Sequence, residues 1–276
     1  MSVKISTFRG QPTVELVLPG GDGVVVALQG AQLLSWRTAD GVERLYLSPD
    51  AVFDGRTAIR GGVPICCPQF NQRGTLAKHG FMRNLPWTLV DQDESGLALA
   101  LDDGAASHVL WPRAFAARLE IFLSPGRLRV ALALANTDTT PWSFTAALHT
   151  YLRVDDIATA RLEGLQGAPR WDALTDRHQT ESAAALAFDA EFDSVYRAPA
   201  QPLRLVQPSG TLEIAQSPRC TETVVWNPGA ALSARLADMP DDGFRHMLCV
   251  EAACIDEPVL LSSGAHWQGW QELTVV

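Results

Sequence analysis

Short apolar runs alternate with turn residues along most of this chain. Leu128, Val130, Leu132 and Leu134 recur at every second position, as in a strand with one buried face. The segment 124–127, Ser-Pro-Gly-Arg, separates this run from the apolar run before it, which predicts a hairpin. By the same reading we expect strands over 24–28, 32–36, 97–101, 115–123, 128–135, 142–152, 203–206, 212–215, 223–226 and 247–251.

Helical patterns are scarce by comparison. The segment 180–188 could form a short helix, but no stretch keeps apolar residues at helical spacing for three turns. The chain has 21 Gly and 17 Pro residues, which supply many turns. We therefore predict an all-β fold, a large sandwich or barrel with few short helices. Because no linker or repeat divides the sequence, we expect residues 1–276 to form one domain.

Composition and charge narrow the range of partners. Of the 276 residues, 47% are hydrophobic and 19% are charged, which is enough for a sizeable core. The net charge of −9 would be repelled by nucleic acid and by anionic lipid, so we expect neither partner. No apolar stretch has the length of a membrane span, and no signal peptide pattern opens the chain. We expect a cytoplasmic protein.

The cysteine spacing and the absence of common nucleotide and metal motifs narrow the classes of reaction that we expect. The five cysteines are an odd number and form no CxxC pair or zinc-finger spacing, so we expect reduced packing residues. There is no Walker A loop, dinucleotide-binding glycine pattern, HExxH or G-x-S-x-G. These absences argue against nucleotide hydrolysis, nicotinamide chemistry and zinc proteolysis. The cysteines are Cys66, Cys67, Cys220, Cys249 and Cys254.

The segment 59–87 holds the densest group of candidate binding residues. Arg60 stands beside a glycine pair, and His79 and Arg83 follow within 24 residues. Guanidinium groups bind phosphate through two hydrogen bonds at once, so these side chains could form an anion pocket. The alternative is a surface loop with solvated arginines.

Three further polar residues interrupt apolar surroundings. His149 lies inside an apolar run, where it could be a hydrogen-bonded core residue or a general acid. Glu251 ends the run 247–251, where it could be a general base with a raised pKa or an edge residue facing water. Asp193 is flanked by apolar residues. Among the tryptophans, we expect Trp267 or Trp270 to be the one that could face a sugar.

We assign no role in the site to the remaining histidines or to three of the tryptophans. We expect the other histidines on the surface, and we expect three tryptophans to pack in the core. The histidines are His108, His178, His246 and His266, and the tryptophans are Trp87, Trp142 and Trp226.

Six motifs in sequence order resemble the aldose 1-epimerase superfamily, and within it most closely the glucose-6-phosphate 1-epimerase branch. The resemblance covers roughly residues 20 to 272, nearly the whole chain. The motifs are IRGGVP at 59–64, HGFMRN at 79–84, LHTY at 148–151, DSVY at 193–196, VVWNP at 224–228 and CVE at 249–251.

This resemblance implies a fold and a set of site residues. The fold would be a galactose-mutarotase-like β-supersandwich with an open cleft for a pyranose and no metal or organic cofactor. The catalytic residues would be His79, His149 and Glu251. The substrate-binding residues would be Asp193 and Gln69 for the sugar, with Arg60 and Arg83 for the phosphate; Arg73 could substitute for either arginine.

The implied activity is the interconversion of α and β anomers of a hexose 6-phosphate. Glu251 would take the proton of the anomeric hydroxyl, and His149 would protonate the ring oxygen. The partner would be a small-molecule sugar phosphate, and we expect a monomer. Three alternatives stay open: an epimerase of free sugars, a non-catalytic sugar-phosphate-binding protein, and a glycoside hydrolase using Asp193 and Glu251 as a carboxylate pair.

Overall fold

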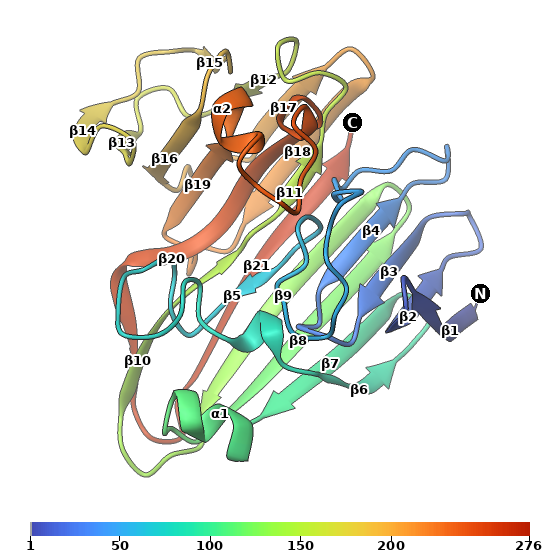
Figure 1. The fold of residues 1–276 in the computed structure, drawn as a ribbon, viewed down its shortest axis with the longest axis vertical. Coiled ribbons are helices and arrows are strands. Elements are labelled where there is room, and N and C mark those ends of the chain that lie inside the picture. The colour runs from blue at the N-terminus through green and yellow to red at the C-terminus, as the bar shows by residue number, and fades with distance from the viewer. Residues whose placement is uncertain (1) are drawn as a thin grey trace.

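The computed structural model describes residues 2–276, and its strands form three antiparallel sheets (Figure 1). The largest sheet has nine strands in the order β15-β12-β17-β18-β21-β9-β8-β7-β6. Its strands are β6 (Thr88–Gln92), β7 (Gly96–Asp102), β8 (Phe115–Ser124), β9 (Arg127–Asn136), β12 (Arg161–Glu163), β15 (Ala185–Leu186), β17 (Leu203–Gln207), β18 (Gly210–Gln216) and β21 (His266–Val275).

The second sheet has eight strands and carries four of the six motifs in whole or in part. Its path is β14-β13-β16-β19-β20-β10-β5, and β11 also pairs with β20. Its strands are β5 (Ile65–Cys66), β10 (Trp142–Leu148), β11 (Tyr151–Arg153), β13 (Pro169–Asp172), β14 (Arg177–Thr180), β16 (Phe192–Arg197), β19 (Glu222–Asn227) and β20 (Met247–Leu261). The third sheet is β1 (Ser2–Phe8), β2 (Gln11–Val17), β3 (Gly23–Ala27) and β4 (Leu33–Arg37).

The helices within residues 2–276 are all short, as the sequence predicts. They are α1 (Ala105–Leu110), α2 (Gly229–Ser233) and the 3₁₀ turns η1 (Met82–Asn84) and η2 (Gly243–His246). The expected helix over 180–188 is wrong, because that segment contains the end of β14 and the short strand β15. None of the helices in the described part of the chain is long and apolar enough to cross a membrane.

The predicted hairpin is confirmed and shows how the pattern builds the core. β8 pairs with β9 from Phe115 with Asn136 to Ser124 with Arg127. The period-two residues of β9 are all buried, as are Leu119 and Ile121 opposite them on β8. Burying alternate side chains in this way removes one face of the sheet from water, which stabilises the fold. One apolar cluster joins residues of all three sheets.

Two strand predictions need correction, and both concern candidate site residues. The expected strand 142–152 is interrupted, because β10 ends at Leu148 and β11 begins at Tyr151. His149 therefore lies at a break in the strand. The expected strand 247–251 continues to Leu261, so Glu251 is in the interior of β20 and not at its end. Glu251 is buried there, and a buried carboxyl group needs a hydrogen-bond or ion-pair partner.

Candidate active site

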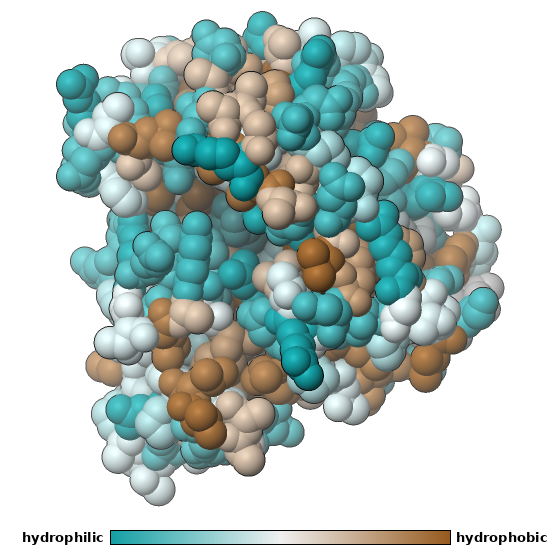
Figure 2. Space-filling view, in the orientation of Figure 1, coloured by the Kyte–Doolittle hydropathy of each residue, from teal (hydrophilic) through white to brown (hydrophobic). Residues whose placement is uncertain are grey.

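A cavity of about 660 Å³ opens at one face of the eight-stranded sheet. Its lining comes from strands β13, β16, β19 and β20 and from the segment 57–84, which contains β5 and η1. The space-filling view shows a hollow beneath the segment that carries α2, with hydrophilic side chains around it (Figure 2). The cavity brings together six of the seven predicted site residues. They are Arg60, His79, Arg83, His149, Asp193 and Glu251.

His149 and Glu251 form a contact at the floor of this cavity. The His149 Nε2 atom lies 3.3 Å from the Glu251 Oε1 atom, and both side chains are buried. His149 reaches this position because the break after β10 lets its backbone N–H donate to the Pro64 carbonyl. Glu251 is held by strand pairing, opposite Val224 on β19. An imidazole and a carboxylate are thus placed side by side.

Burial drives both groups toward their uncharged forms. It raises the pKa of Glu251 well above its usual range, and nearby Asp193 raises it further. Burial also lowers the pKa of His149 well below its usual range, with a further contribution from the charges of Arg83 and Arg60. Both shifts favour the uncharged pair, a protonated Glu251 beside a neutral His149. The second oxygen of Glu251 and the Nδ1 atom of His149 have no hydrogen-bond partner among residues 2–276.

His79 faces the same floor as a neutral hydrogen-bond donor. Its Nδ1 atom accepts a hydrogen bond from the Asn71 backbone N–H at 3.2 Å, which leaves the ring proton on Nε2. Burial lowers the pKa of His79 to about 3, and the charges of Arg83 and Lys78 contribute to this. Its ring lies edge-on to that of His149, with 5.5 Å between centroids. A neutral N–H donor in this position can stabilise negative charge on a substrate oxygen.

Asp193 lines the cavity from β16, paired with Trp226 of β19. Burial raises the pKa of its carboxyl to about 6, Lys78 opposes that rise, and Glu191 adds to it. A carboxylate that remains partly solvated at a cavity wall is suited to accept hydrogen bonds from hydroxyl groups.

The two predicted arginines are held in different ways. Arg60 makes an ion pair with Asp238 and donates to the Tyr151 hydroxyl. Arg83 donates from Nη2 to the Lys78 carbonyl, and its buried Nε atom has no partner among residues 2–276. Because both arginines line the cavity, their guanidinium groups can bind an anion that enters it. Arg73 also lines the cavity and stacks over the Trp171 ring, 4.7 Å from its centroid.

Gln69 does not line the cavity. Its amide nitrogen donates to the carbonyls of Asn71 and Leu76, and its amide oxygen accepts from the Leu76 backbone N–H. The side chain is therefore used within the loop that carries His79. The predicted role of Gln69 in sugar binding stays a prediction, since this side chain is hydrogen-bonded within the loop and is not among the residues that line the cavity.

The tryptophan predictions are partly wrong. Trp267 is buried against Phe144, and Trp270 lies under the Arg129 guanidinium. Both belong to a separate groove of about 960 Å³ over the nine-stranded sheet, which contains none of the predicted site residues. Instead, Trp171 and Trp226 line the cavity that holds His149. The aromatic character of a sequence position does not reveal the sheet face that the side chain will occupy.

Sequence reasoning left several cavity residues out of the site. Lys78, which directly precedes the motif 79–84, lines the cavity and lowers the pKa values of both Asp193 and Glu251. It is one of only two lysines in the chain, a signal that could have singled it out. Tyr151 stacks on His149 with 4.9 Å between ring centroids and 12° between planes. Asp238 carries no motif that could have revealed it.

The same floor offers a set of metal-ligand atoms. The Cys249 sulfur lies with the ligand atoms of His149 and Glu251 within 4.8 Å of one another. These three side chains could therefore hold a cation. The expectation that the protein uses no metal stays a prediction.

Comparison with known proteins assigns the chain to a family. The aldose 1-epimerase family model matches residues 12–274. The chain belongs to the aldose 1-epimerase family. The predicted resemblance and the all-β, mutarotase-like fold are therefore confirmed.

Relatives place the chain more closely within the family. A protein of Cenchrus ciliaris named "Putative glucose-6-phosphate 1-epimerase" is 35% identical over 267 residues, covering 91% of this chain and 80% of that protein. One of Escherichia coli with the same name is 38% identical over 240 residues, covering 84% and 79%. The crystal structure of a "putative mutarotase (YeaD)" from Salmonella typhimurium has a TM-score of 0.90 at 29% identity, covering 99% of this chain and 93% of that one.

Proposed function

We propose that this protein interconverts the α and β anomers of a hexose 6-phosphate by opening and reclosing the sugar ring. The observation that carries the proposal is the contact of His149 with Glu251 at the floor of a cavity whose lining includes several cationic side chains. Family membership supports epimerase chemistry, and the names of the relatives support a phosphorylated hexose. The substrate is therefore a small-molecule sugar phosphate.

Ring opening needs one base and one acid on either side of the anomeric centre. Glu251 takes the proton of the anomeric hydroxyl, while His149 delivers its proton to the ring oxygen and the C1–O5 bond breaks. The aldehyde then turns about the bond to C2, and reclosure reverses both transfers. The pair starts and ends the cycle with one proton, which can move across the 3.3 Å contact between the two side chains.

The other cavity residues bind the sugar and its charge. His79 donates from Nε2 to the oxygen that becomes the open-chain carbonyl. Asp193 accepts hydrogen bonds from ring hydroxyls and so orients the sugar. Arg83, Arg60 and Lys78 lie around the cavity as cations that can bind the phosphate, far from the reacting carbon. Binding energy from the phosphate can then hold the ring in its reactive position.

Glu251→Gln is the decisive substitution. Glutamine keeps the size of the side chain but cannot accept the proton, so we expect anomer exchange of glucose 6-phosphate to fall at least about a hundredfold. Magnetisation-transfer NMR measures that exchange directly. Glu257→Gln is a matched control, because Glu257 lies exposed on the same strand, β20.

The outcomes separate the alternatives left open by the sequence. Equal exchange in wild type and Glu251→Gln would contradict the assigned base. Exchange of free glucose as fast as that of glucose 6-phosphate would identify an epimerase of free sugars. Binding of glucose 6-phosphate without exchange would identify a binding protein, and cleavage of a chromogenic glycoside would identify a hydrolase.

A further inference from the structure

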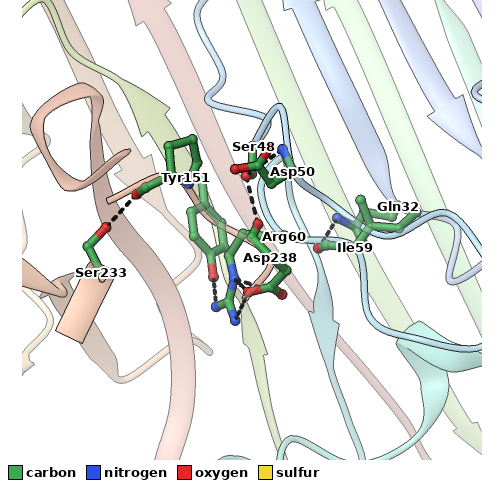
Figure 3. A network of polar contacts seen from close by, with 9 residues as sticks. Gln32, Ser48, Asp50, Ile59, Arg60, Tyr151, Ser233 and Asp238 are labelled. Carbon is green, nitrogen blue, oxygen red and sulfur yellow. Dashed lines mark hydrogen bonds and ion pairs between the residues drawn. The ribbon is translucent and has the colours of Figure 1, made fainter. Parts of the chain in front are cut away.

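Asp238 meets Arg60 across 178 positions of sequence. The Arg60 Nε atom donates to both carboxylate oxygens of Asp238 at 3.2 Å, and Nη2 donates to Oδ1 at 3.1 Å. On its other side, Nη1 donates to the Tyr151 hydroxyl at 3.1 Å. Figure 3 shows the guanidinium between these two partners. All three residues line the cavity; the side chains of Arg60 and Asp238 are partly exposed, and Tyr151 is buried.

These contacts leave part of the guanidinium free for a ligand. An arginine has five N–H groups, and Asp238 and Tyr151 engage three of them. Nη1 and Nη2 each keep one N–H, and together these can bind two oxygens of a phosphate. The protein partners therefore orient the arginine without using all of its donors.

The carboxylate itself is held by a fastened loop. Asp238 lies between α2 and η2, and its backbone carbonyl accepts a hydrogen bond from the Ser48 hydroxyl at 2.7 Å. On the other side of Asp238, the Ser233 hydroxyl donates to the Pro240 carbonyl at 3.0 Å, and the intervening residue Met239 is buried. Because hydrogen bonds anchor the loop on both sides of Asp238, the position of this carboxylate does not depend on Arg60. Asp238 can therefore orient the guanidinium.

We propose that Asp238 is a positioning residue that makes Arg60 a preorganised ligand for the substrate phosphate; the inference rests on the proposed function. Two effects of the carboxylate oppose each other. Its negative charge repels the phosphate, and its hydrogen bonds remove the conformational freedom that Arg60 would otherwise lose on binding. Orientation is the larger effect, because the ion pair is partly exposed and its charge is screened by water.

The test compares two asparagine substitutions on one loop. Asp238→Asn removes the charge that holds Arg60, whereas Asp241→Asn removes the same charge from an exposed residue three positions away. We expect Asp238→Asn to raise the KM for glucose 6-phosphate about tenfold with kcat little changed, and to weaken competitive inhibition by inorganic phosphate by a similar factor. We expect Asp241→Asn to match wild type.

A positioning role predicts a further result that a general loss of structure would not produce. Exchange of unphosphorylated glucose, at whatever rate wild type supports it, should be the same in Asp238→Asn. Arg60→Lys, which keeps the charge but not the paired N–H groups, should reproduce the rise in KM. An unchanged or lower KM in Asp238→Asn would overturn the proposal, as would an equal loss with both sugars.

Failure of the proposed function can be recognised separately. Broadening of the ³¹P resonance of glucose 6-phosphate measures its binding without any turnover. If wild type binds the sugar phosphate but does not accelerate its exchange, the proposed activity fails, and the dissociation constants of the two variants still test the role of Asp238.

Discussion

Asp193 is a carboxyl group whose burial opposes its own ionisation. Its pKa is about 6 in the folded protein, compared with 3.8 for an unperturbed aspartate. The folded state therefore holds this proton more tightly than the unfolded state does. The contribution of this group to stability is greatest below pH 3.8 and is lost as the pH rises through 6. At neutral pH the ionised carboxylate is destabilising, which is consistent with a residue kept for binding.

Asp193→Asn should stabilise the fold and weaken sugar binding. Asparagine carries no charge to bury, so we expect the free energy of unfolding at pH 8 to rise by about 1–2 kcal/mol, a value reduced for partial exposure. The gain should vanish near pH 4, and the KM for glucose 6-phosphate should rise at both pH values. Guanidinium unfolding curves measure the first effect. Asp189→Asn, at an exposed position nearby, is the control. A loss of stability at pH 8 would show that the carboxylate has a stabilising partner.

The same buried environment controls the protonation of both His149 and Glu251. Burial alone would leave each side chain uncharged and inactive as an ion. Because they touch, the charged arrangement with a carboxylate and an imidazolium differs from the neutral arrangement only by the position of one proton. The pair can therefore supply both a base and an acid without carrying net charge into the core.

At the scale of elements, interruptions of regular structure place the two histidines that we propose as catalytic. His149 lies in the gap between β10 and β11. His79 lies in the loop between β5 and η1, with a φ of +66°, and the following residue, Gly80, has a φ of +69°. Two consecutive left-handed residues turn the chain sharply, and the Gly80 backbone forms a bridge with Cys67. Regular strands would point neither ring at the cavity floor in this way.

Gly80→Ala should disturb this turn. A Cβ atom at Gly80 would lie 2.3 Å from the Cys67 carbonyl oxygen, a distance that no side-chain rotation can relieve. We expect stability to fall by about 1–3 kcal/mol more than in a simple left-handed glycine replacement, and anomer exchange to fall with it as His79 shifts.

Gly41→Ala provides that simple replacement, because Gly41 has a φ of +83° with nothing within 4 Å of the added Cβ atom. Thermal unfolding and exchange rates measured on both variants show whether the contact with Cys67 causes the extra loss at Gly80. Equal losses in the two variants would mean that the contact with Cys67 is not the cause.

At the scale of the whole molecule, several cations gather at the cavity, beside the carboxyl groups that also line it, although the chain as a whole is acidic. The chain carries a net charge of −9, yet Arg60, Arg83 and Lys78 meet at the cavity. A local group of cations on an acidic protein favours a small anion over an extended polyanion such as nucleic acid. The expectation of a monomer stays a prediction.

The core holds all five cysteines as free, buried thiols, as the sequence predicts. Burial raises the pKa of Cys66 and of Cys254 to about 12. Since the thiolate is the reactive form, we expect Ellman's reagent to detect fewer than about one thiol per chain in the native protein, and all five in guanidinium. Rapid reaction of several thiols in the native state would contradict this packing.

Patterns in the sequence predicted the fold class correctly and singled out most of the polar residues that the cavity brings together. Period-two patterns such as 128–135 predicted the strands correctly, because alternate burial depends only on neighbouring residues. Six motif segments led to the residues that the cavity assembles. Their order in the chain was enough to recognise the family, although it could not show the distances between them.

How distant segments meet could not be predicted from local patterns and follows from the folded chain. It paired Arg60 with Asp238, turned Gln69 into the loop and placed Trp226, instead of Trp267, at the cavity. It also placed Glu251 inside a strand, since β20 continues through its contacts with β10. Local patterns report which side chains are buried, whereas the partner of a buried or half-buried side chain depends on sheet pairing and on the path of loops far away in sequence.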